Sequence, residues 1–338
     1  MESNIGVPLG RWPLAIAGNI NLDIKTSLIA AADGVMSDGE TGIEEIYESL
    51  GGGGANTAMA AAGLGGGVHF FGCVGADELG DRLEAILAGY GIVAHLARKD
   101  TTTGRSINLN WDNGCRHFIS SLPNNRSLTG EDIDVDAMIA AGCRQLLRAD
   151  VWFSESLLAE GNYALLGRAR AAGIETYLDI NWDPEWSIPG NGRRVRERCE
   201  QLTRVLPYIH YVHGNERELA YFTGRNDLRE ACGCLLDQGC SSVVIHRGDK
   251  GAASVSAAEG WIEVPAAAVA SSVCSTACGD VFCAAHMLLR DLDTRERLRA
   301  SASIAADHLS GKRVLIPRLN DRRPGRKDGH DVHRKVPV

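Results

Sequence analysis

The chain reads Ser275-Thr276-Ala277-Cys278-Gly279-Asp280-Val281-Phe282 at the point where an expected pair of strands gives way to a long helix. Small residues in this turn let backbone N–H groups converge, and together with the helix dipole these groups form an anion site. An Asp at the same turn can accept a proton from an attacking hydroxyl and align it for in-line displacement. The plain alternative is an Asp that caps an ordinary helix. The segment therefore suits phosphoryl transfer, and other segments must decide between the two interpretations.

Strands and helices alternate along the rest of the chain. Short apolar segments predict strands at residues 12–17, 68–73, 151–153, Glu175–Asp179, 208–212 and Ser242–His246. Segments between them predict helices at residues 57–64, 79–88, 163–172, 193–202, 216–221 and 228–238, and further helices start at Asp280 and Arg295. Residues 251–255 and 261–264 are expected to form an antiparallel pair. This order is typical of an α/β protein whose mostly parallel sheet is covered by helices.

Composition and charge exclude several classes of protein. The 338 residues carry a formal net charge of −8, which argues against a protein that neutralises nucleic-acid phosphates. We find no signal-peptide pattern and no run of about 18 apolar residues, so no membrane span is expected. The ten cysteines include no C-x-x-C pair, and buried free thiols are expected rather than a zinc site. We therefore expect a cytoplasmic protein without nucleic-acid or membrane partners.

Further motifs accompany the turn at Asp280. In chain order they are Gly18-Asn19-Ile20-Asn21-Leu22-Asp23, Gly51-Gly52-Gly53-Gly54-Ala55-Asn56, Val74-Gly75-Ala76-Asp77-Glu78-Leu79-Gly80, Asn215-Glu216-Arg217-Glu218 and Val243-Val244-Ile245-His246-Arg247-Gly248-Asp249-Lys250-Gly251. Together with the turn, they resemble the motifs of the PfkB/ribokinase family of carbohydrate kinases. The resemblance runs in order over about residues 12–317, nearly the whole chain.

The resemblance implies a fold and a domain organisation. It implies a doubly wound, mostly parallel α/β sandwich (ribokinase-like) with a small β-sheet lid over the substrate. The half-polar residues at about 24–49 and 101–118 would form this lid. Residues 1–320 would be one kinase domain, and residues 321–338 a flexible charged tail with almost no apolar content.

The resemblance also implies a role for single residues. Asp280 would be the catalytic base, and the amides of Ala277, Cys278, Gly279 and Asp280 would hold the transferred phosphoryl group. Substrate hydroxyls would bind to Asn21, Asp23, Gly52, Gly53 and Asn56. ATP and Mg²⁺ would bind near Asn215, Glu218, His246, Gly248 and Gly251, with Glu218 serving the metal. Simpler roles exist, since Asn56 could cap a helix and Glu218 could lie on a solvated face.

Three positions depart from the family pattern. Cys274 stands where an Asp is usual, which puts potassium activation in doubt, and His246 replaces a Thr beside the nucleotide turn. Family members that act on acidic sugars often carry D-x-N-x-R, but Asp183 stands here at the Arg position. Because an Asp would repel a carboxylate, we expect neutral polyhydroxy substrates to be preferred over sugar acids.

Other functions are weighed on the same residues. No G-x-x-x-x-G-K-[ST] occurs, which excludes a P-loop kinase, and the glycines at residues 51–54 follow a poor buried strand for a Rossmann dehydrogenase. The function expected is ATP-dependent phosphorylation of a hydroxyl of a sugar or sugar-like molecule. A nucleoside kinase and a non-catalytic ligand-binding regulator on the same fold stay open as alternatives. Lids in the family often pair between subunits, so a homodimer through the lid is possible.

Overall fold

The computed structural model describes residues 10, 12–30, 38–113, 115–269 and 277–319. Three residues of the motif region, Cys274, Ser275 and Thr276, lie outside the described residues, as does the tail expected at 321–338. None of the helices in the described ranges is long and apolar enough to cross a membrane.

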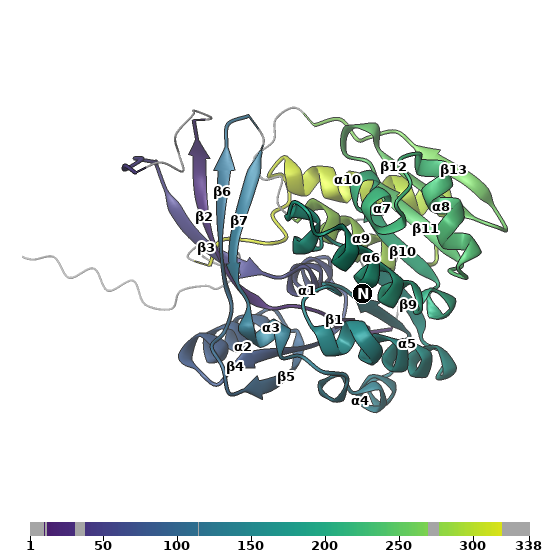
Figure 1. Cartoon of the computed structure of the whole chain (residues 1–338), viewed down its shortest axis with the longest axis horizontal. Helices are drawn as coiled ribbons and strands as arrows, with labels where there is room; N and C mark the ends of the chain where they lie inside the picture. The colour runs from purple at the N-terminus through teal and green to yellow at the C-terminus, as the bar shows by residue number, and fades with distance from the viewer. Residues whose placement is uncertain (1–9, 11, 31–37, 114, 270–276, 320–338) are drawn as a thin grey trace, which may run out of the picture.

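The larger sheet has nine strands within the described ranges, in the order β13-β12-β11-β10-β9-β8-β1-β4-β5 (Figure 1). These strands are β1 (Leu14–Ala17), β4 (Val68–Gly75), β5 (Val93–Lys99), β8 (Gln145–Arg148), β9 (Glu175–Asp179), β10 (Tyr211–Asn215), β11 (Ser242–His246), β12 (Ala252–Ser256) and β13 (Gly260–Val264). The strands from β11 to β5 pair in parallel, whereas β12 and β13 add antiparallel to β11. The predicted mostly parallel sheet and its antiparallel pair are confirmed.

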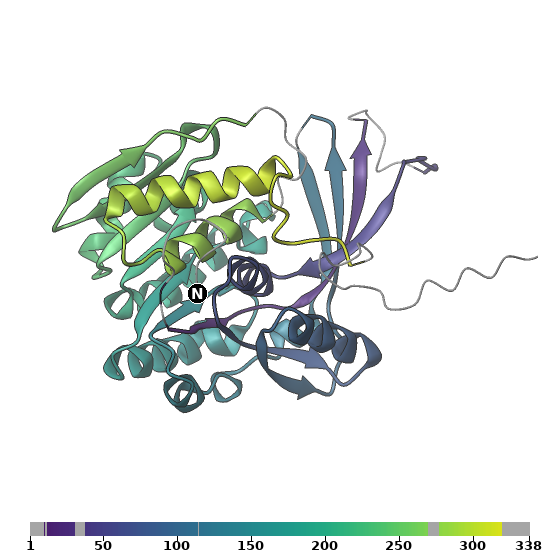
Figure 2. The ribbon, with the colours of Figure 1, turned by 180° about the vertical axis from the view of Figure 1, so that it is seen from behind.

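Helices cover both faces of the larger sheet (Figure 2). The α-helices are α1 (Gly53–Gly63), α2 (Glu78–Gly89), α3 (Pro123–Arg126), α4 (Val135–Ala140), α5 (Asn162–Ala171), α6 (Gly192–Thr203), α7 (Glu216–Thr223), α8 (Leu228–Asp237), α9 (Cys278–Leu288) and α10 (Thr294–Leu309). Side chains of β1 alternate between two cores, because successive residues of a strand point to opposite faces. Ala15 and Ala17 join the core under α5, α6 and α8, whereas Leu14 and Ile16 join the core under α1, α2 and α9. The α/β sandwich that the sequence predicted is therefore confirmed.

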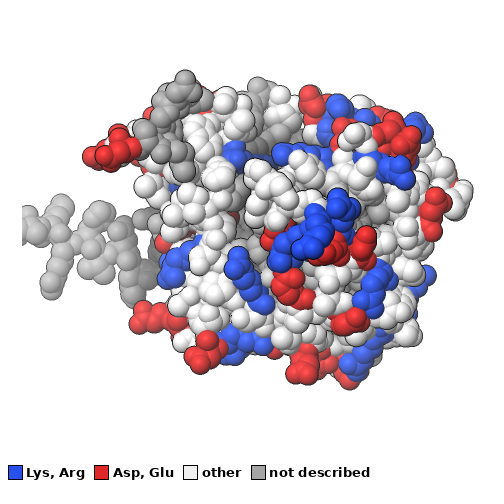
Figure 3. All heavy atoms as spheres, viewed as in Figure 1, with Lys and Arg blue, Asp and Glu red and all other residues white. Residues whose placement is uncertain are grey.

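The second sheet has four described strands in the order β3-β2-β6-β7 and stands beside the larger sheet (Figure 1). Its strands are β2 (Asn21–Ile29), β3 (Ile46–Gly51), β6 (Arg105–Trp111) and β7 (Arg116–Ser121). One face carries Asp23, Lys25 and Asn108, which are buried. On the opposite face Ile24, Ile107 and Ile119 are in register across three strands, and the last two are 41% and 48% exposed. Few charged side chains cover β6 and β7 in Figure 3.

The strand predicted at residues 151–153 is wrong. The strand at this place is β8, which ends at Arg148, and residues 151–153 form a turn. Asp150 has a positive φ of 56°, a left-handed conformation that cannot continue a strand. Val151 and Trp152 are nevertheless buried, which explains the apolar pattern that misled the prediction. The turn places Asp150 at the carboxyl edge of the sheet, where ligands bind in open α/β folds.

Candidate active site

Asp280 lies in the first turn of α9, which begins at Cys278 and not at Asp280 as the sequence predicted. The N-cap is Ala277, in the left-handed conformation with φ 64°, and no side chain of a described residue caps the helix. Asp280 Oδ2 instead accepts a hydrogen bond of 3.1 Å from Nδ2 of Asn56 in α1. The helix-cap interpretation of Asp280 is therefore wrong, because its carboxylate accepts a hydrogen bond from α1 and does not cap its own helix.

The environment of Asp280 disfavours its charged form. Burial raises its pKa well above the ordinary Asp range, and the negative charge of Asp150 raises it further. The hydrogen bond from Asn56 acts in the opposite direction, and Glu218 adds a smaller upward shift. A carboxylate with a raised pKa is a stronger base, so this environment suits a group that accepts a proton from a hydroxyl.

Asp150 holds the glycine-rich start of α1 in place. Its carboxylate accepts backbone hydrogen bonds from Gly54 (2.8 Å), Asn19 (2.9 Å) and Gly53 (3.1 Å). Its own N–H donates to Asn181 Oδ1 at 2.7 Å. Asp150 was not predicted from the sequence, although an Asp just after a buried apolar strand is the signal that could have found it. It links the loops after β1, β8 and β9.

Neighbouring atoms lie close to the backbone at two of the predicted substrate glycines, Gly52 and Gly53. Gly52 has φ 94°, and a Cβ atom there would lie 2.3 Å from the carbonyl oxygen of Asn19. At Gly53 a Cβ atom would lie 2.8 Å from Asp150 Oδ1. Only glycine fits at Gly52, because an added side chain would be strained and would also clash with backbone. The same turn brings Asn56 to Asp280.

The predicted residues Asn21 and Asp23 lie together on the buried face of the second sheet. Asn21 Nδ2 donates to Asp23 Oδ1 at 2.8 Å, and Asn108 Nδ2 donates to Asp23 Oδ2 at 3.0 Å. Lys25 Nζ lies 3.7 Å from Asp23 Oδ2, and its charge also lowers the pKa of Asp280. Lys25 and Asn108 were not predicted as site residues. This face presents polar groups that can bind hydroxyls beside Asp280.

Asn215 and Glu218 form a reciprocal capping box at the start of α7. Asn215 Oδ1 accepts from the Glu218 N–H at 2.9 Å, and Glu218 Oε2 accepts from the Asn215 N–H at 2.8 Å. The simpler, structural role of this motif is therefore present in the molecule. It does not use all of the Glu218 side chain, since one carboxylate oxygen makes the cap and the other can bind a ligand.

A candidate cation site lies next to this helix start. Ligand atoms of Asp179, Glu218 and His246 lie within 4.8 Å of one another. Burial raises the pKa of Asp179 well above its ordinary range, and the negative charges of Glu218 and Asp280 add to this effect. Buried carboxylates that repel one another fit a bound cation, so the site suits the Mg²⁺ that the resemblance implied. The sequence predicted Glu218 for the metal but missed Asp179.

The predicted nucleotide residues follow β11. His246 ends this strand, and its ring packs against Gly279, where a Cβ atom would lie 3.3 Å from Cε1. Burial lowers the pKa of His246 to about 4. Gly248 begins the tight turn η5 (Gly248–Lys250), and Gly251 follows directly after it. The two glycines have positive φ of 58° and 92°. The structure thus places His246 against Gly279 at the start of α9, with the two glycines beyond it.

Asp183 does not act as the sequence led us to expect. It is fully buried, and its Oδ2 lies 2.8 Å from Nε of Arg198 in α6. Its Oδ1 accepts from the Glu185 N–H at 3.0 Å and caps the short helix η3 (Pro184–Ser187). Because Arg198 neutralises this carboxylate, its charge gives no basis for repelling an acidic substrate. The structure therefore gives no support to the argument from which we predicted a preference for neutral substrates.

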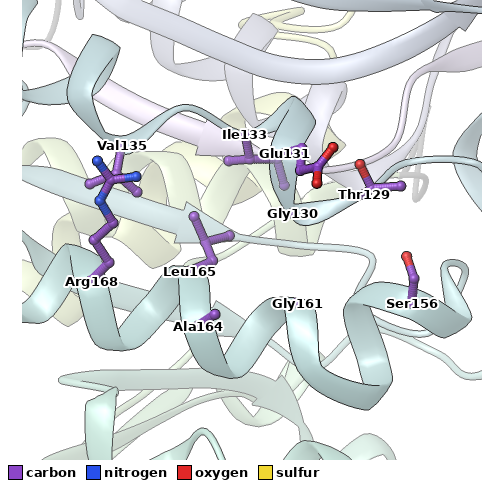
Figure 4. Close-up of a pocket in the computed structure, with 10 residues that line it drawn as sticks. All are labelled: Thr129, Gly130, Glu131, Ile133, Val135, Ser156, Gly161, Ala164, Leu165 and Arg168. Atoms are coloured by element: carbon purple, nitrogen blue, oxygen red, sulfur yellow. The ribbon is translucent and has the colours of Figure 1, made fainter.

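A separate hollow of about 460 Å³ is lined by residues of α4 and α5 and of the segment between residues 129 and 133 (Figure 4). It is bordered by Glu131, Ile133, Leu165 and Arg168, among other residues. None of its lining residues belongs to the predicted site. The predicted site residues therefore lie outside this hollow.

Solved structures share this fold. A ribokinase from Thermotoga maritima superposes with a TM-score of 0.71 at 23% identity, covering 91% of this chain and 96% of the other. An E. coli protein assigned as a ribokinase II, solved in complex with ATP and Mg²⁺, superposes with a TM-score of 0.73 at 21% identity, covering 88% and 93%. These likenesses confirm the ribokinase-like fold with its smaller second sheet.

Sequence comparison gives the family. A deoxyribokinase from Salmonella typhi is 25% identical over 312 residues, which cover 88% of this chain and 93% of that protein. The model of the pfkB family of carbohydrate kinases matches residues 22–307. This range includes Asp23, the glycine-rich start of α1, the capping box of α7 and Asp280. The chain belongs to the pfkB family of carbohydrate kinases.

Proposed function

We propose that this chain transfers the γ-phosphoryl group of ATP to a hydroxyl of a sugar or sugar-like molecule, with Asp280 as the base. The observation that carries the proposal is the position of Asp280 in the first turn of α9. Its carboxylate is hydrogen-bonded to Asn56 of α1 and not to its own helix. A half-buried carboxylate at a helix N-terminus combines a proton acceptor with an anion site.

The start of α9 would hold the phosphoryl group in transfer. Ala277, Cys278, Gly279 and Asp280 contribute the first backbone N–H groups of a helix of 11 residues. The first N–H groups of any α-helix lie outside its repeating i to i−4 hydrogen-bond pattern, and the helix dipole adds positive potential there. Asp280 would take the hydroxyl proton as the oxygen attacks, so that the alkoxide never forms as a free charge.

ATP and Mg²⁺ are the co-substrate and metal that we propose. Asn215, Glu218, His246, Gly248 and Gly251 would border the nucleotide phosphates, with Glu218 and Asp179 available to the cation. When bound, Mg²⁺ neutralises charge on the phosphates and on these carboxylates. The E. coli relative solved with ATP and Mg²⁺ supports this choice, although it is only 21% identical.

The substrate would bind between α1 and the second sheet, which we propose as a lid. Asn21 and Asp23 lie on the face of that sheet that also carries Asn108, and Asn56 and Gly53 lie at the start of α1. Carboxylate and amide groups bind hydroxyls through paired hydrogen bonds, which is what a polyhydroxy substrate offers. A nucleoside shares these hydroxyls through its ribose, so it is the second substrate class to test.

The experiment is ADP formation by the purified protein with MgATP and a panel of neutral sugars, sugar acids and nucleosides. We expect substrate-dependent ADP formation with at least one sugar, and loss of that activity in Asp280→Asn. A higher kcat/KM for a nucleoside than for every sugar would favour the nucleoside kinase. Ligand binding without turnover on the whole panel would contradict the proposal and favour a regulator on this fold.

We also propose a homodimer that forms through the second sheet. Ile24, Ile107 and Ile119 form an apolar row on the face opposite Asp23. Ile107 and Ile119 are exposed, and pairing with a second copy would remove this row from water. Sedimentation velocity should give a dimer for the wild type and a monomer for Ile107→Lys. A monomeric wild type at micromolar concentration would contradict this assembly.

A cytoplasmic location completes the proposal. The nine cysteines in the described ranges form no disulfide. Free thiols persist in the reducing compartment where ATP is also abundant. Fractionation with an antibody against the protein tests this, and recovery from an oxidising compartment would contradict it.

A further inference from the structure

After α10 the chain crosses to the second sheet. Figure 2 shows the yellow segment that follows α10 running toward the strands of that sheet. Leu315 and Ile316 are 5% and 9% exposed and belong to the core under α1, α2 and α9. Further on, the Leu319 N–H donates a hydrogen bond of 2.8 Å to the carbonyl oxygen of Glu48 in β3. Residues 315–319, which we call the strap, therefore connect the helices of the larger sheet with the second sheet.

The first residues of the strap are fixed against α1 and α10. The Leu315 N–H donates to Nδ1 of His308, in the last turn of α10, at 3.3 Å. A Cβ atom at Gly63, the last residue of α1, would lie 3.0 Å from Cδ2 of Leu315. Because two apolar side chains are buried here in close contact with helices, this end of the strap should move with α1 and α10.

The last residues of the strap pair with the outer edge of β3. Arg318 and Ser49 form an antiparallel bridge, on the edge of β3 that does not pair with β2. The Arg318 guanidinium carbon lies 4.1 Å from the centroid of the Tyr47 ring, and the guanidinium forms an ion pair with Glu45. Backbone pairing, cation–π stacking and an ion pair thus hold this end of the strap against β3.

The strap continues the row of the second sheet that carries Asp23. Residues directly opposite one another in paired strands have their side chains on the same face. Ser49 lies opposite Asp23 in β2 and opposite Arg318 in the strap. The strand β3 ends at Gly51, directly before Gly52 at the start of α1. A shift of β3 would therefore move both the polar face and the glycine turn to which we assign the substrate.

We propose that the strap holds the second sheet in the position that binds substrate, with Arg318 as a positioning residue. The Arg318 side chain is 43% exposed and acts through Tyr47 and the backbone of β3. The inference rests on the proposed function, because it assumes that the second sheet binds the substrate. Loosening the strap should then weaken substrate binding and leave the proposed nucleotide site, at the ends of β10 and β11, unchanged.

The first test is hydrogen exchange of the full chain without ligands, measured on peptides by mass spectrometry. Arg318→Ala removes both the ion pair with Glu45 and the stacking on Tyr47. We expect the peptide that contains the Leu319 amide to exchange about 5- to 10-fold faster in this variant, and peptides of the larger sheet to exchange as in the wild type. Arg299→Ala is the matched control, because Arg299 is an exposed arginine on α10 outside the strap and should leave the exchange at Leu319 unchanged.

The second test is the separation of KM from kcat, with MgATP and the substrate identified from the panel. Arg318→Ala should raise KM for that substrate about three- to tenfold, while kcat and KM for MgATP stay within about twofold. Arg318→Lys keeps a cation near Glu45 and should recover part of the affinity. Leu319→Pro is a second, independent variant, because it removes the N–H that bonds to Glu48 and should raise KM in the same way.

Exchange of the Leu319 amide at the wild-type rate in Arg318→Ala would overturn the attachment to β3. A substrate KM within about twofold of the wild type in both Arg318→Ala and Leu319→Pro would overturn the positioning role, and so would a fall in kcat alone. A wild type that phosphorylates no compound of the panel would refute the proposed function and the positioning role with it. In that case the exchange rates still decide whether the strap holds the second sheet.

Discussion

Replacing Asp280 with Asn removes one negative charge and almost no volume. The carboxylate accepts a hydrogen bond from Asn56 Nδ2, while Oδ1 of Asn56 is buried without a partner among the described residues. In Asp280→Asn, a rotated Asn56 amide could accept from the new side chain, so the contact between α1 and α9 would persist. The variant should therefore fold and separate the chemical role of Asp280 from its structural one.

The loss of turnover follows from the role of a base. General-base groups contribute about 10²–10⁴ in rate, which corresponds to roughly 2.7–5.5 kcal/mol of transition-state stabilisation at 1.36 kcal/mol per tenfold. Asn cannot accept the hydroxyl proton, so kcat should fall by that range while ATP binding is retained. In the wild type, the acid limb of kcat/KM should lie above the ordinary Asp range, because burial and Asp150 raise the pKa of Asp280.

The free energy of unfolding of Asp280→Asn should rise, whereas its turnover should fall. Because the folded-state pKa of Asp280 is raised, the folded protein binds more protons than the unfolded chain above the ordinary Asp range. The wild type therefore loses stability as pH rises from about 3.8 through the folded-state pKa. Asp280→Asn has no such loss, so its free energy of unfolding at neutral pH should exceed that of the wild type by roughly 0.5–2 kcal/mol.

The assay is coupled ADP release for kcat, together with urea unfolding at pH 4 and pH 7 for stability. Asp293→Asn is the matched control, since Asp293 is an exposed N-cap of α10 and Asn can also cap a helix. The control should change turnover less than twofold. Turnover of Asp280→Asn within about threefold of the wild type would refute Asp280 as the base. The free energy of unfolding of Asp280→Asn minus that of the wild type should be larger at pH 7 than at pH 4. A smaller difference at pH 7 would refute the electrostatic reasoning.

Three further predictions concern the surroundings of the site. Asp150→Ala should lower the free energy of unfolding by about 3–5 kcal/mol in urea, because three backbone N–H groups lose a charged acceptor, and Asp150→Asn should recover part of it; a loss below about 1 kcal/mol would contradict this. Arg198→Met should cost about 3–5 kcal/mol at pH 7 by leaving Asp183 buried and unpaired, and less at pH 4, where that carboxyl can protonate; a cost independent of pH would speak against it. Cys278, at the first position of α9, should be alkylated more slowly with MgATP present, as measured by peptide mass, and equal rates would remove it from the phosphoryl site.

The layers of the fold could be predicted from the sequence because short segments with strand character alternate with segments of helical periodicity along most of the chain. The strand β5 was not predicted, since only part of it is apolar. Ser242–His246 and Glu175–Asp179 were predicted to the residue. Residues 151–153 were not, since an apolar run shows burial but not the backbone conformation of the residue before it. The positive φ of Asp150 that ends β8 leaves no mark in composition or periodicity.

Sequence motifs could also predict which groups might act, but not how they are neutralised. The motifs predicted Asp280 and Asn56, and the structure joins them across 224 residues of sequence. They misjudged Asp183, because its partner Arg198 lies in another helix at no fixed spacing. Asn108 stayed unnoticed because strand pairing in the second sheet puts it beside Asp23. Lys25 was missed although it lies two residues after Asp23 on the same strand and hence on the same face.

Several carboxylates gather at the carboxyl edge of the larger sheet, and their charges should lower the stability of the folded protein when no ligand is bound. Asp150, Asp179 and Glu218 are buried at that edge and Asp280 is half-buried there. Removal from solvent raises the pKa of each of them. For Asp179 and Asp280, neighbouring carboxylates raise the pKa further. Such charges weaken the folded protein near neutral pH, where the unfolded chain would ionise them freely. A cation offsets that repulsion only where it reaches several carboxylates at once, and the end of β9 and the start of α7 provide such a place. Metal binding should therefore stabilise the protein more at pH 8 than at pH 5, because the carboxylates it neutralises are more fully ionised there.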